Sequence, residues 1–207
     1  MNPETEEVES DSGTEEINST PRNLPNILIT GTPGTGKTTH CELLMTSNSS
    51  SNEPLGIRSI NIGEFVKENE CHQGWDDEWQ SFIVDDDKLL DALEPHFTST
   101  QGGIILDWHS SCLFPEDWFD LIIVLRTPHN KLWDRLERRG YHLNKIQENN
   151  LAEIMGECFN EAISNYNHQI VIELNSDLID EIDENVNRIL AWIHNWIKDH
   201  ASDTVTT

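Results

Sequence analysis

The stretch GTPGTGKT, residues 31–38, decides the fold that we predict for this chain. It has the spacing GxxxxGK(S/T) and lies between a β-forming apolar run at 26–30 and a helical pattern that begins at residue 37. Glycines let a backbone wrap around a phosphate, and the start of a helix presents free N–H groups with partial positive charge. We therefore interpret the stretch as a nucleotide-binding phosphate loop, and not as a Gly-rich turn without a ligand.

Two side chains of this loop and two from a later segment are candidate functional groups. Lys37 is expected to reach the outer phosphates, and Thr38 is expected to offer its hydroxyl to Mg²⁺. Asp107 closes the apolar run at 104–107, where such folds place the second carboxylate of the Mg²⁺ site. His109 follows, and its imidazole would either orient a nucleophile, stabilise the transferring group, or serve only the structure.

Apolar β-forming runs alternate with helical patterns along the rest of the chain, which indicates a three-layer α/β fold. The predicted strands are 26–30, 58–62, 104–107, 121–125 and 170–174. The predicted helices are 37–46, 87–97, 128–139, 147–164 and 178–200, the last with one apolar stripe that should dock on the sheet. Residues 46–54, rich in Ser and Asn, are interpreted as a surface loop.

The chain is strongly acidic, since 13 Lys and Arg against 38 Asp and Glu give its 207 residues a formal net charge of −25. This charge argues against autonomous binding to nucleic acid or to an anionic membrane surface, and it favours a basic protein partner. We predict one domain at 24–201, with disordered tails at 1–23 and 202–207. The alternative for the acid-rich tail at 1–23 is that it serves as an acidic interaction arm.

The location expected from the sequence is intracellular. Neither a long apolar run nor the pattern of a signal peptide is evident, so no membrane association is expected. Four cysteines show no CxxC pair and no metal-ligand spacing, and we expect them to be reduced thiols: Cys41, Cys71, Cys112 and Cys158.

Charge is unevenly distributed within the predicted domain. Residues 126–145 hold six bases against two acids, and Arg135, Arg138 and Arg139 recur at helical spacing near a predicted helix end. These arginines would either close over phosphates or complement the helix dipole. Residues 61–94 hold eleven acids and two bases.

The acidic segment 61–94 leaves two questions open. The run at 85–87, three Asp, would either cap the following helix or contact a basic partner, a base or a ribose. The aromatic side chains of Phe65, Trp75 and Trp79 would either stack on an acceptor base or pack in the core.

The class of phosphate-loop protein follows partly from what the sequence lacks. The guanine-reading motif NKxD has one near match, at 130–133, and it ends in Trp133 instead of Asp. Guanine specificity is therefore not expected, and a motor or transporter ATPase would need a longer chain. A short α/β domain with this loop near its start indicates a small-molecule or nucleotide kinase.

A series of motifs, in order along residues 24–200, resembles the adenylate kinase isoenzyme 6 family. The motifs are GTPGTGKTT, Asn61-Ile62-Gly63, Gly74-Trp75-Asp76, Asp85-Asp86-Asp87-Lys88-Leu89-Leu90, Asp107-Trp108-His109, Phe114-Pro115-Glu116, Val124-Leu125-Arg126, Arg139-Gly140-Tyr141, Glu153-Ile154 and AWIHNWI at 191–197.

The resemblance implies a P-loop fold of the nucleoside monophosphate kinase type, with five parallel strands in the order 2-3-1-4-5 and a short lid. It implies that 61–84 bind the monophosphate, that 138–148 form the lid, and that Lys37, His109 and Arg139 are catalytic. The residues it implies for ATP are Gly31, Gly34, Thr35, Gly36, Lys37, Thr38, Thr39 and Arg139, and those for Mg²⁺ are Thr38 and Asp107.

The resemblance also implies adenylate kinase activity on AMP or other nucleoside monophosphates and an ATPase activity, in nucleus and cytoplasm. It implies a role in maturing 18S rRNA through a basic small-subunit ribosomal protein, so that the pre-ribosomal particle is contacted indirectly. The chain departs from longer adenylate kinases in having Lys67 as the only base in 61–84, where they carry an Arg. The main alternative is an assembly-factor ATPase whose kinase activity is secondary; a nucleotide-binding module without catalysis is disfavoured by the Lys, the Mg²⁺ ligands and the arginines.

Overall fold

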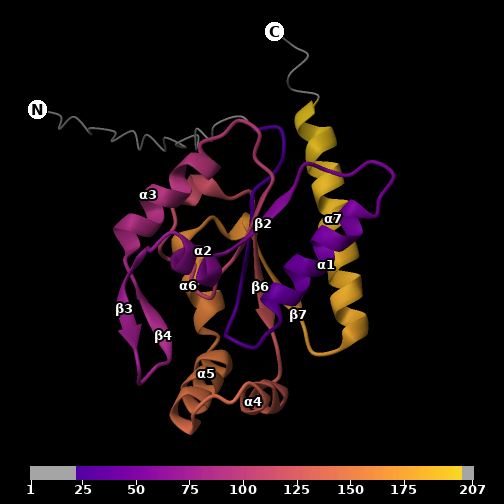
Figure 1. The fold of residues 1–207 in the computed structure, drawn as a ribbon. Coiled ribbons are helices and arrows are strands. Elements are labelled where there is room, and N and C mark those ends of the chain that lie inside the picture. The colour runs from indigo at the N-terminus through magenta and orange to yellow at the C-terminus, as the bar shows by residue number, and fades with distance from the viewer. Residues whose placement is uncertain (1–21, 202–207) are drawn as a thin grey trace, which may run out of the picture.

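A single parallel sheet forms the centre of the protein, as a computed structural model of residues 22–201 shows (Figure 1). Its strands are β1 (Ile27–Thr30), β2 (Arg58–Asn61), β5 (Ile104–Asp107), β6 (Leu121–Arg126) and β7 (Val171–Asn175). They lie in the order β2-β5-β1-β6-β7, and every neighbouring pair is parallel. Counted along the chain, this is the order 2-3-1-4-5, so the expected three-layer α/β fold is confirmed.

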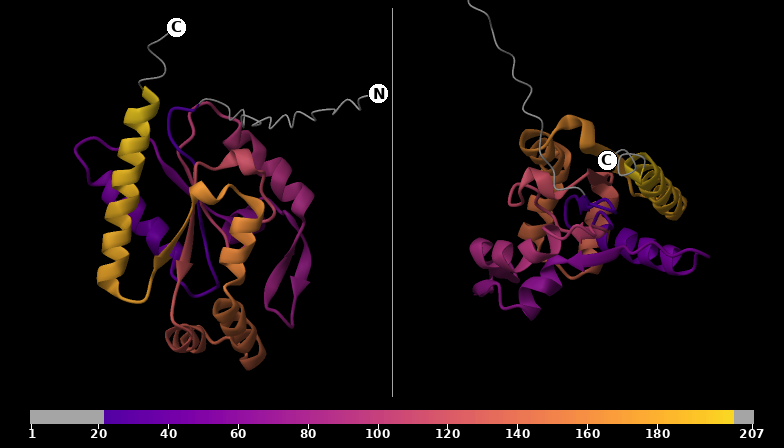
Figure 2. Two further views of the ribbon diagram at one scale, coloured as in Figure 1. Left: turned by 180° about the vertical axis from the view of Figure 1, so that it is seen from behind. Right: turned by 90° about the horizontal axis from the view of Figure 1, so that it is seen from above.

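Helices cover both faces of this sheet (Figures 1 and 2). One face is covered by α1 (Lys37–Ser49) and α7 (Ile179–Ala201), and the other by α2 (Ile62–Glu68), α3 (Asp86–Phe97) and α6 (Glu157–Asn165). Beyond the carboxyl ends of the strands lie α4 (His129–Arg138) and α5 (Leu143–Met155). Short 3-10 turns occur at Glu116–Trp118 and His168–Ile170.

The central strands are buried on both faces, which explains their nearly continuous apolar sequence. Along β1, Leu28 packs with the α2, α3 and α6 layer, whereas Ile27 and Ile29 pack with α1 and α7. All three side chains are fully buried. This alternation is the two-residue period of a strand, and it gives the domain one core on each side of the sheet.

The structure corrects two element boundaries. The single helix predicted at 147–164 is wrong: α5 and α6 are separate helices, because Gly156 between them has the left-handed φ of 67°. The predicted loop at 46–54 is helical at its start, since α1 continues to Ser49. The Asn48 side chain then hydrogen-bonds both the N–H and the carbonyl of Leu55, which closes the remaining loop.

The acid-rich region 61–84 contains structure that the sequence did not reveal. It forms α2 and a separate hairpin of β3 (His72–Asp76) and β4 (Ser81–Val84), which stands apart from the main sheet (Figure 1). The region has no long apolar period, because only parts of its elements face the core. Its helix begins at Asn61, whose side-chain oxygen accepts from the Glu64 N–H.

The predicted tails lie almost entirely outside the described residues. At 1–23, only the last two positions are described, and Arg22 donates to the carbonyls of Asp117 and Trp118 while pairing with Asp120 at 3.6 Å. The N–H of Asn23 donates to the carbonyl of Thr100. Both residues therefore contact the folded part of the chain.

Two further expectations concern cysteines and membranes. The four cysteines are free thiols, as predicted. Within residues 22–201, the helices fall short of the length and apolar character that crossing a membrane requires.

The break at Gly156 generates a stability prediction. Gly156→Ala should lower the free energy of unfolding by about 1 kcal/mol, because a Cβ strains the left-handed conformation. Steric crowding does not explain the cost, since the Cβ would lie 3.6 Å from Arg126 Nη1, which is an ordinary van der Waals contact. Urea unfolding measures the difference. Gly156→Asn is the matched control and should lose less, since Asn tolerates this conformation; equal losses for Ala and Asn would contradict the explanation.

Candidate functional site

The phosphate-loop sequence lies at the carboxyl end of β1 and leads into α1, as the motif predicts. Gly31 has φ of 140°, and a Cβ there would lie 2.6 Å from the Leu125 carbonyl oxygen. Gly34 has φ of 99°, and a Cβ there would lie 2.8 Å from Leu132 Cδ1. The loop can therefore follow this path only because these two residues lack side chains.

The Lys37 ammonium lies inside the curve of the loop. Its Nζ donates to the Gly31 carbonyl at 2.7 Å and to the Thr32 carbonyl at 3.3 Å. An ammonium has three donors, so this geometry leaves one for a phosphate oxygen. Burial lowers the pKa of Lys37, although the charge of Asp107 opposes the shift.

A hydroxyl from the first turn of α1 and a carboxylate from the end of β5 meet beside the loop. Thr38 Oγ1 donates to Asp107 Oδ2 at 2.6 Å, and Asn61 Nδ2 donates to the same oxygen at 2.7 Å. Oxygen ligands of this kind suit Mg²⁺, which proteins commonly hold with one or two carboxylates plus substrate phosphates. The arrangement fits the predicted Mg²⁺ site. The structure also brings Asn61 to this carboxylate. No local sequence pattern predicts that contact, because Asn61 and Asp107 lie 46 residues apart.

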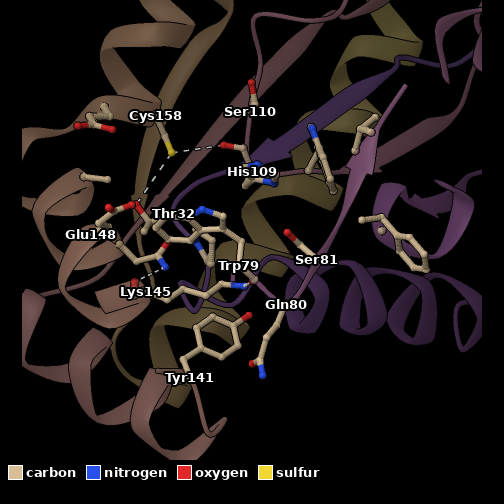
Figure 3. Close-up of a pocket in the computed structure, with 18 of the residues that line it drawn as sticks. Thr32, Trp79, Gln80, Ser81, His109, Ser110, Tyr141, Lys145, Glu148 and Cys158 are labelled. Atoms are coloured by element: carbon tan, nitrogen blue, oxygen red, sulfur yellow. Dashed lines mark hydrogen bonds between the residues drawn. The ribbon is translucent and has the colours of Figure 1, made fainter. Parts of the chain in front are cut away.

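A cavity of about 860 Å³ opens on one side of the loop (Figure 3). Thr32 and Pro33 of the loop border it, together with His109 after β5. Most of the remaining wall comes from α2, the β3–β4 hairpin, the connection between α4 and α5, and the helices α5 and α6, through residues that include Trp75, Trp79, Phe82, Tyr141, Lys145 and Glu161. Lys145 Nζ donates to the Trp79 carbonyl and lies 4.5 Å from the Tyr141 ring centroid, so it links α5 to the hairpin.

His109 is held at this cavity by contacts on several sides. Its ring packs on that of Trp108, with the centroids 4.2 Å apart, and its carbonyl accepts from the thiol of Cys158 (Figure 3). The side chain opens to solvent in the cavity, but partial desolvation there and the charge of Lys37 lower the pKa of His109 to about 4. The imidazole is therefore neutral at pH 7 and can accept a hydrogen bond.

The loop that follows His109 is clamped by α6. Glu161 accepts from the backbone N–H groups of Ser111 and Cys112 and from the hydroxyls of Ser110 and Ser111. Burial alone would raise the pKa of Glu161, but these hydrogen bonds lower it below its ordinary value. Glu161 thus fixes the segment that carries His109, a role without any local sequence signal, because the partners lie about fifty residues apart.

A smaller cleft, of about 310 Å³, adjoins the other part of the phosphate loop. It is lined by Gly34, Gly36, Thr39, Arg135, Arg138, Arg139 and Ile182. The structure therefore brings Arg139 to the loop, as expected, but on the wall of this cleft, whereas His109 lines the larger cavity.

The three arginines at the end of α4 have different environments. The Arg135 guanidinium donates to four acceptors: the carbonyls of Gly34, Ser176 and Asp177 and the hydroxyl of Thr127. In this structure Arg135 therefore acts as a structural clamp on the wall of the cleft. Arg138 and Arg139 are exposed on the cleft wall, where they can reach a bound anion.

The structure shows where residues of the other open alternatives lie. Trp75 and Trp79 line the larger cavity, whereas Phe65 packs against the core. Asp85 caps α3, because its side chain accepts from the Lys88 N–H and pairs with the Lys88 ammonium at 3.3 Å. Thr35 supports the loop itself, since its hydroxyl donates to the Thr32 carbonyl at 2.9 Å.

Comparison with known proteins finds relatives along most of the chain. A profile of the AAA domain family matches residues 27–156. An adenylate kinase isoenzyme 6 homolog of Schizosaccharomyces pombe is 51% identical over 86% of this chain and 97% of its own length. A homolog of the same name from Dictyostelium discoideum is 45% identical over 84% of this chain and 95% of its own length.

Two solved structures share the fold. Shikimate kinase from Bacteroides thetaiotaomicron has a TM-score of 0.52 at 14% identity, covering 83% of this chain and 99% of its own. A gluconokinase from Sinorhizobium meliloti has a TM-score of 0.50 at 14% identity, covering 88% of this chain and 98% of its own. At this identity the likeness concerns the fold alone, and it is the fold of phosphate-loop kinases.

The clamp at Glu161 generates a pH-dependent prediction. Because its pKa is lowered in the folded state, its contribution to stability is present above the unfolded value near 4.5 and is lost as pH falls through the folded value. The wild type should therefore be more stable than Glu161→Gln at pH 7, and the difference should shrink below pH of about 4. Urea unfolding across this pH range measures it.

The matched control is Glu184→Gln, an exposed acid on α7. It should change the free energy of unfolding by no more than about 0.5 kcal/mol at any of these pH values. A Glu161→Gln difference that stays constant down to pH 3 would contradict the assigned clamp.

Proposed function

This chain belongs to the AAA domain family and to the family of adenylate kinase isoenzyme 6 homologues, and on that premise we propose that it transfers the γ-phosphoryl group of ATP to AMP or a related nucleoside monophosphate. One observation carries the proposal: the phosphate loop borders both the smaller cleft, which is lined by arginines, and the larger cavity, which is lined by aromatic side chains and His109. Phosphoryl transfer needs a donor and an acceptor held in line on opposite sides of the transferred phosphorus, and a site on each side of the loop can hold them in this way.

The donor is assigned to the smaller cleft. There Gly34, Gly36 and Thr39 would offer loop and helix N-terminal groups to the phosphates of ATP, and Arg139 would add positive charge. Lys37 would contact the outer phosphates with its remaining donor. Thr38 and Asp107 would hold Mg²⁺, which supplies charge that neutralises the phosphate oxygens.

The acceptor is assigned to the larger cavity. Trp75 and Trp79 offer aromatic faces on which a base can stack. His109, neutral at pH 7, can accept a hydrogen bond from an acceptor phosphate that carries a proton, or from a water molecule. The catalysis would come from placing the reacting groups and from stabilising charge with Lys37 and Arg139, and not from a covalent step on the protein.

The charge of this cavity supports a second activity. Within the described part of the chain, its wall contains Glu148, Glu157 and Glu161 but only one Lys, Lys145, and no Arg. Such a wall would bind a dianionic phosphate weakly, so phosphoryl transfer to the acceptor would be slow relative to other adenylate kinases. Hydrolysis of ATP, with water in place of the monophosphate, would then compete.

The same acidity supports a basic partner. We propose that the ATPase activity serves maturation of the small ribosomal subunit and its 18S rRNA, in nucleus and cytoplasm, through a basic small-subunit ribosomal protein. The net charge of −25 favours such a partner, and it disfavours direct binding to the RNA of the pre-ribosomal particle. The alternative is that this nucleotide-gated binding is the main output and that the kinase activity is secondary.

A coupled assay with MgATP and a panel of nucleoside monophosphates tests the kinase proposal. ADP should form in an AMP-dependent manner, and Lys37→Ala should lower kcat by about 100-fold or more, because it removes charge stabilisation at the transferring group. Lys88→Ala, an exposed lysine on α3, is the control and should behave as wild type. The proposal fails if AMP does not raise ADP formation, or if Lys37→Ala turns over like wild type.

Titration of the purified chain with a recombinant basic small-subunit ribosomal protein tests the second proposal. The affinity should fall as ionic strength rises, and ATP and ADP should change it relative to the nucleotide-free chain by about tenfold. In cells, His109→Ala should impair ribosome maturation more than it impairs nucleotide binding. An affinity that is the same in all nucleotide states, together with unchanged small-subunit precursors after depletion, would exclude this role.

A further inference from the structure

Beyond the residues assigned to nucleotide binding, we propose that Glu153 is a positioning residue that holds the phosphate loop in its binding geometry from α5. The inference rests on the proposed function in one respect, since it takes the loop to bind ATP. It concerns a buried carboxylate that contacts neither the smaller cleft nor the larger cavity.

Three segments meet at this carboxylate. Glu153 Oε2 accepts from Thr32 Oγ1 of the loop at 2.6 Å. Its other oxygen accepts from Arg126 Nε at 2.9 Å and from the Thr127 N–H at 3.0 Å, both at the end of β6. The residue is only 4% exposed, so these hydrogen bonds are what make a buried charge tolerable there.

The contact reaches the Lys37 ammonium through a single residue. The Thr32 hydroxyl is held by Glu153, while the Thr32 carbonyl accepts from Lys37 Nζ at 3.3 Å and from Thr35 Oγ1 at 2.9 Å. A shift of Thr32 would therefore displace one of the two carbonyl acceptors that orient Lys37. Glu153 in this way helps to position the phosphate-binding ammonium, without touching a nucleotide itself.

Arg126 fixes the position of Glu153 through further contacts. Its Nη2 donates to the Glu153 carbonyl at 2.8 Å, and its Nη1 pairs with Glu173 of β7 at 2.6 Å. The end of α5 is thus tied to two strands of the sheet. Because Leu151 and Ala152, the two residues before Glu153, line the larger cavity, the same helix end joins the cavity wall to the loop.

A merely structural role for Glu153 would affect stability alone. The chain offers a matched control in Glu173, whose carboxylate pairs with the same Arg126 but, within residues 22–201, makes no hydrogen bond or ion pair with the loop. Loss of Glu173 disturbs the arginine, whereas loss of Glu153 disturbs both the arginine and Thr32. ATP affinity, compared with thermal stability, separates the two roles.

The experiment measures the Kd of the full chain for MgATP without any acceptor, together with Tm. Glu153→Ala should raise Kd about tenfold, because it removes one charge-assisted hydrogen bond to the loop. Glu153→Gln should bind more tightly than Glu153→Ala, since its amide still accepts from Arg126 and can donate to Thr32. Glu173→Ala should stay within about twofold of wild type, because an exposed ion pair contributes little.

Thr32→Val supplies a second variant in case Glu153→Ala does not fold. It keeps the volume of the side chain but removes the hydroxyl, and it should raise Kd to a similar extent. The double variant with Glu153→Ala should be no worse than the poorer single variant, because both remove the same contact. Wild-type Kd for both Glu153→Ala and Thr32→Val, or for Thr32→Val alone where Glu153→Ala is unfolded, would overturn the proposal. Absence of ATP binding by the wild type would instead overturn the proposed function.

Discussion

Parallel pairing of β1 with β5 and β6 is the constraint on which the site depends. The register sets Ile29 beside Asp107 and Thr30 beside Val124, so the loop after β1 begins next to the end of β5 and two residues before the end of β6. Carboxyl ends of parallel strands share one edge of a sheet, and ligands bind there in open α/β folds. A slip of one residue in β5 would turn the Asp107 side chain to the opposite face and separate it from Thr38.

The same edge explains why several charged residues support the loop instead of facing a ligand. The loop passes so close to β6 and α4 that Gly31 and Gly34 cannot carry side chains. Arg135 satisfies carbonyls on both sides of this crossing, and Glu153 satisfies the Thr32 hydroxyl from α5. Buried polar groups need such partners, so part of the positive charge near the loop is committed to structure. Arg138 and Arg139 remain on the cleft wall for an anion.

The larger cavity illustrates how a wall is assembled from distant segments. The β3–β4 hairpin, the segment after β5 and the paired helices α5 and α6 each contribute one side, and Lys145 and Glu161 link them by hydrogen bonds to backbone groups. Because the wall carries several carboxylates, the acidity of the chain extends into the proposed acceptor site. Both the net negative charge of the chain and the carboxylates on the cavity wall therefore disfavour tight binding of an acceptor that carries a phosphate.

Local sequence determined the phosphate loop, the five central strands and most of the helices, because glycine spacing and apolar periodicity report the backbone conformation of the residues that carry them. It missed the hairpin and the break at Gly156, where acid-rich composition and a single left-handed residue leave little periodic signal. It left open whether Arg135 closes over phosphates or complements the helix dipole. Only the tertiary structure decided that Glu153 holds Thr32 and that Glu161 holds the segment that carries His109. It also decided that Arg139 lines the smaller cleft and His109 the larger cavity. The contacts with Thr32 and with the His109 segment join residues 49 to 121 positions apart, and a side chain's partner at such separation is set by how the layers pack.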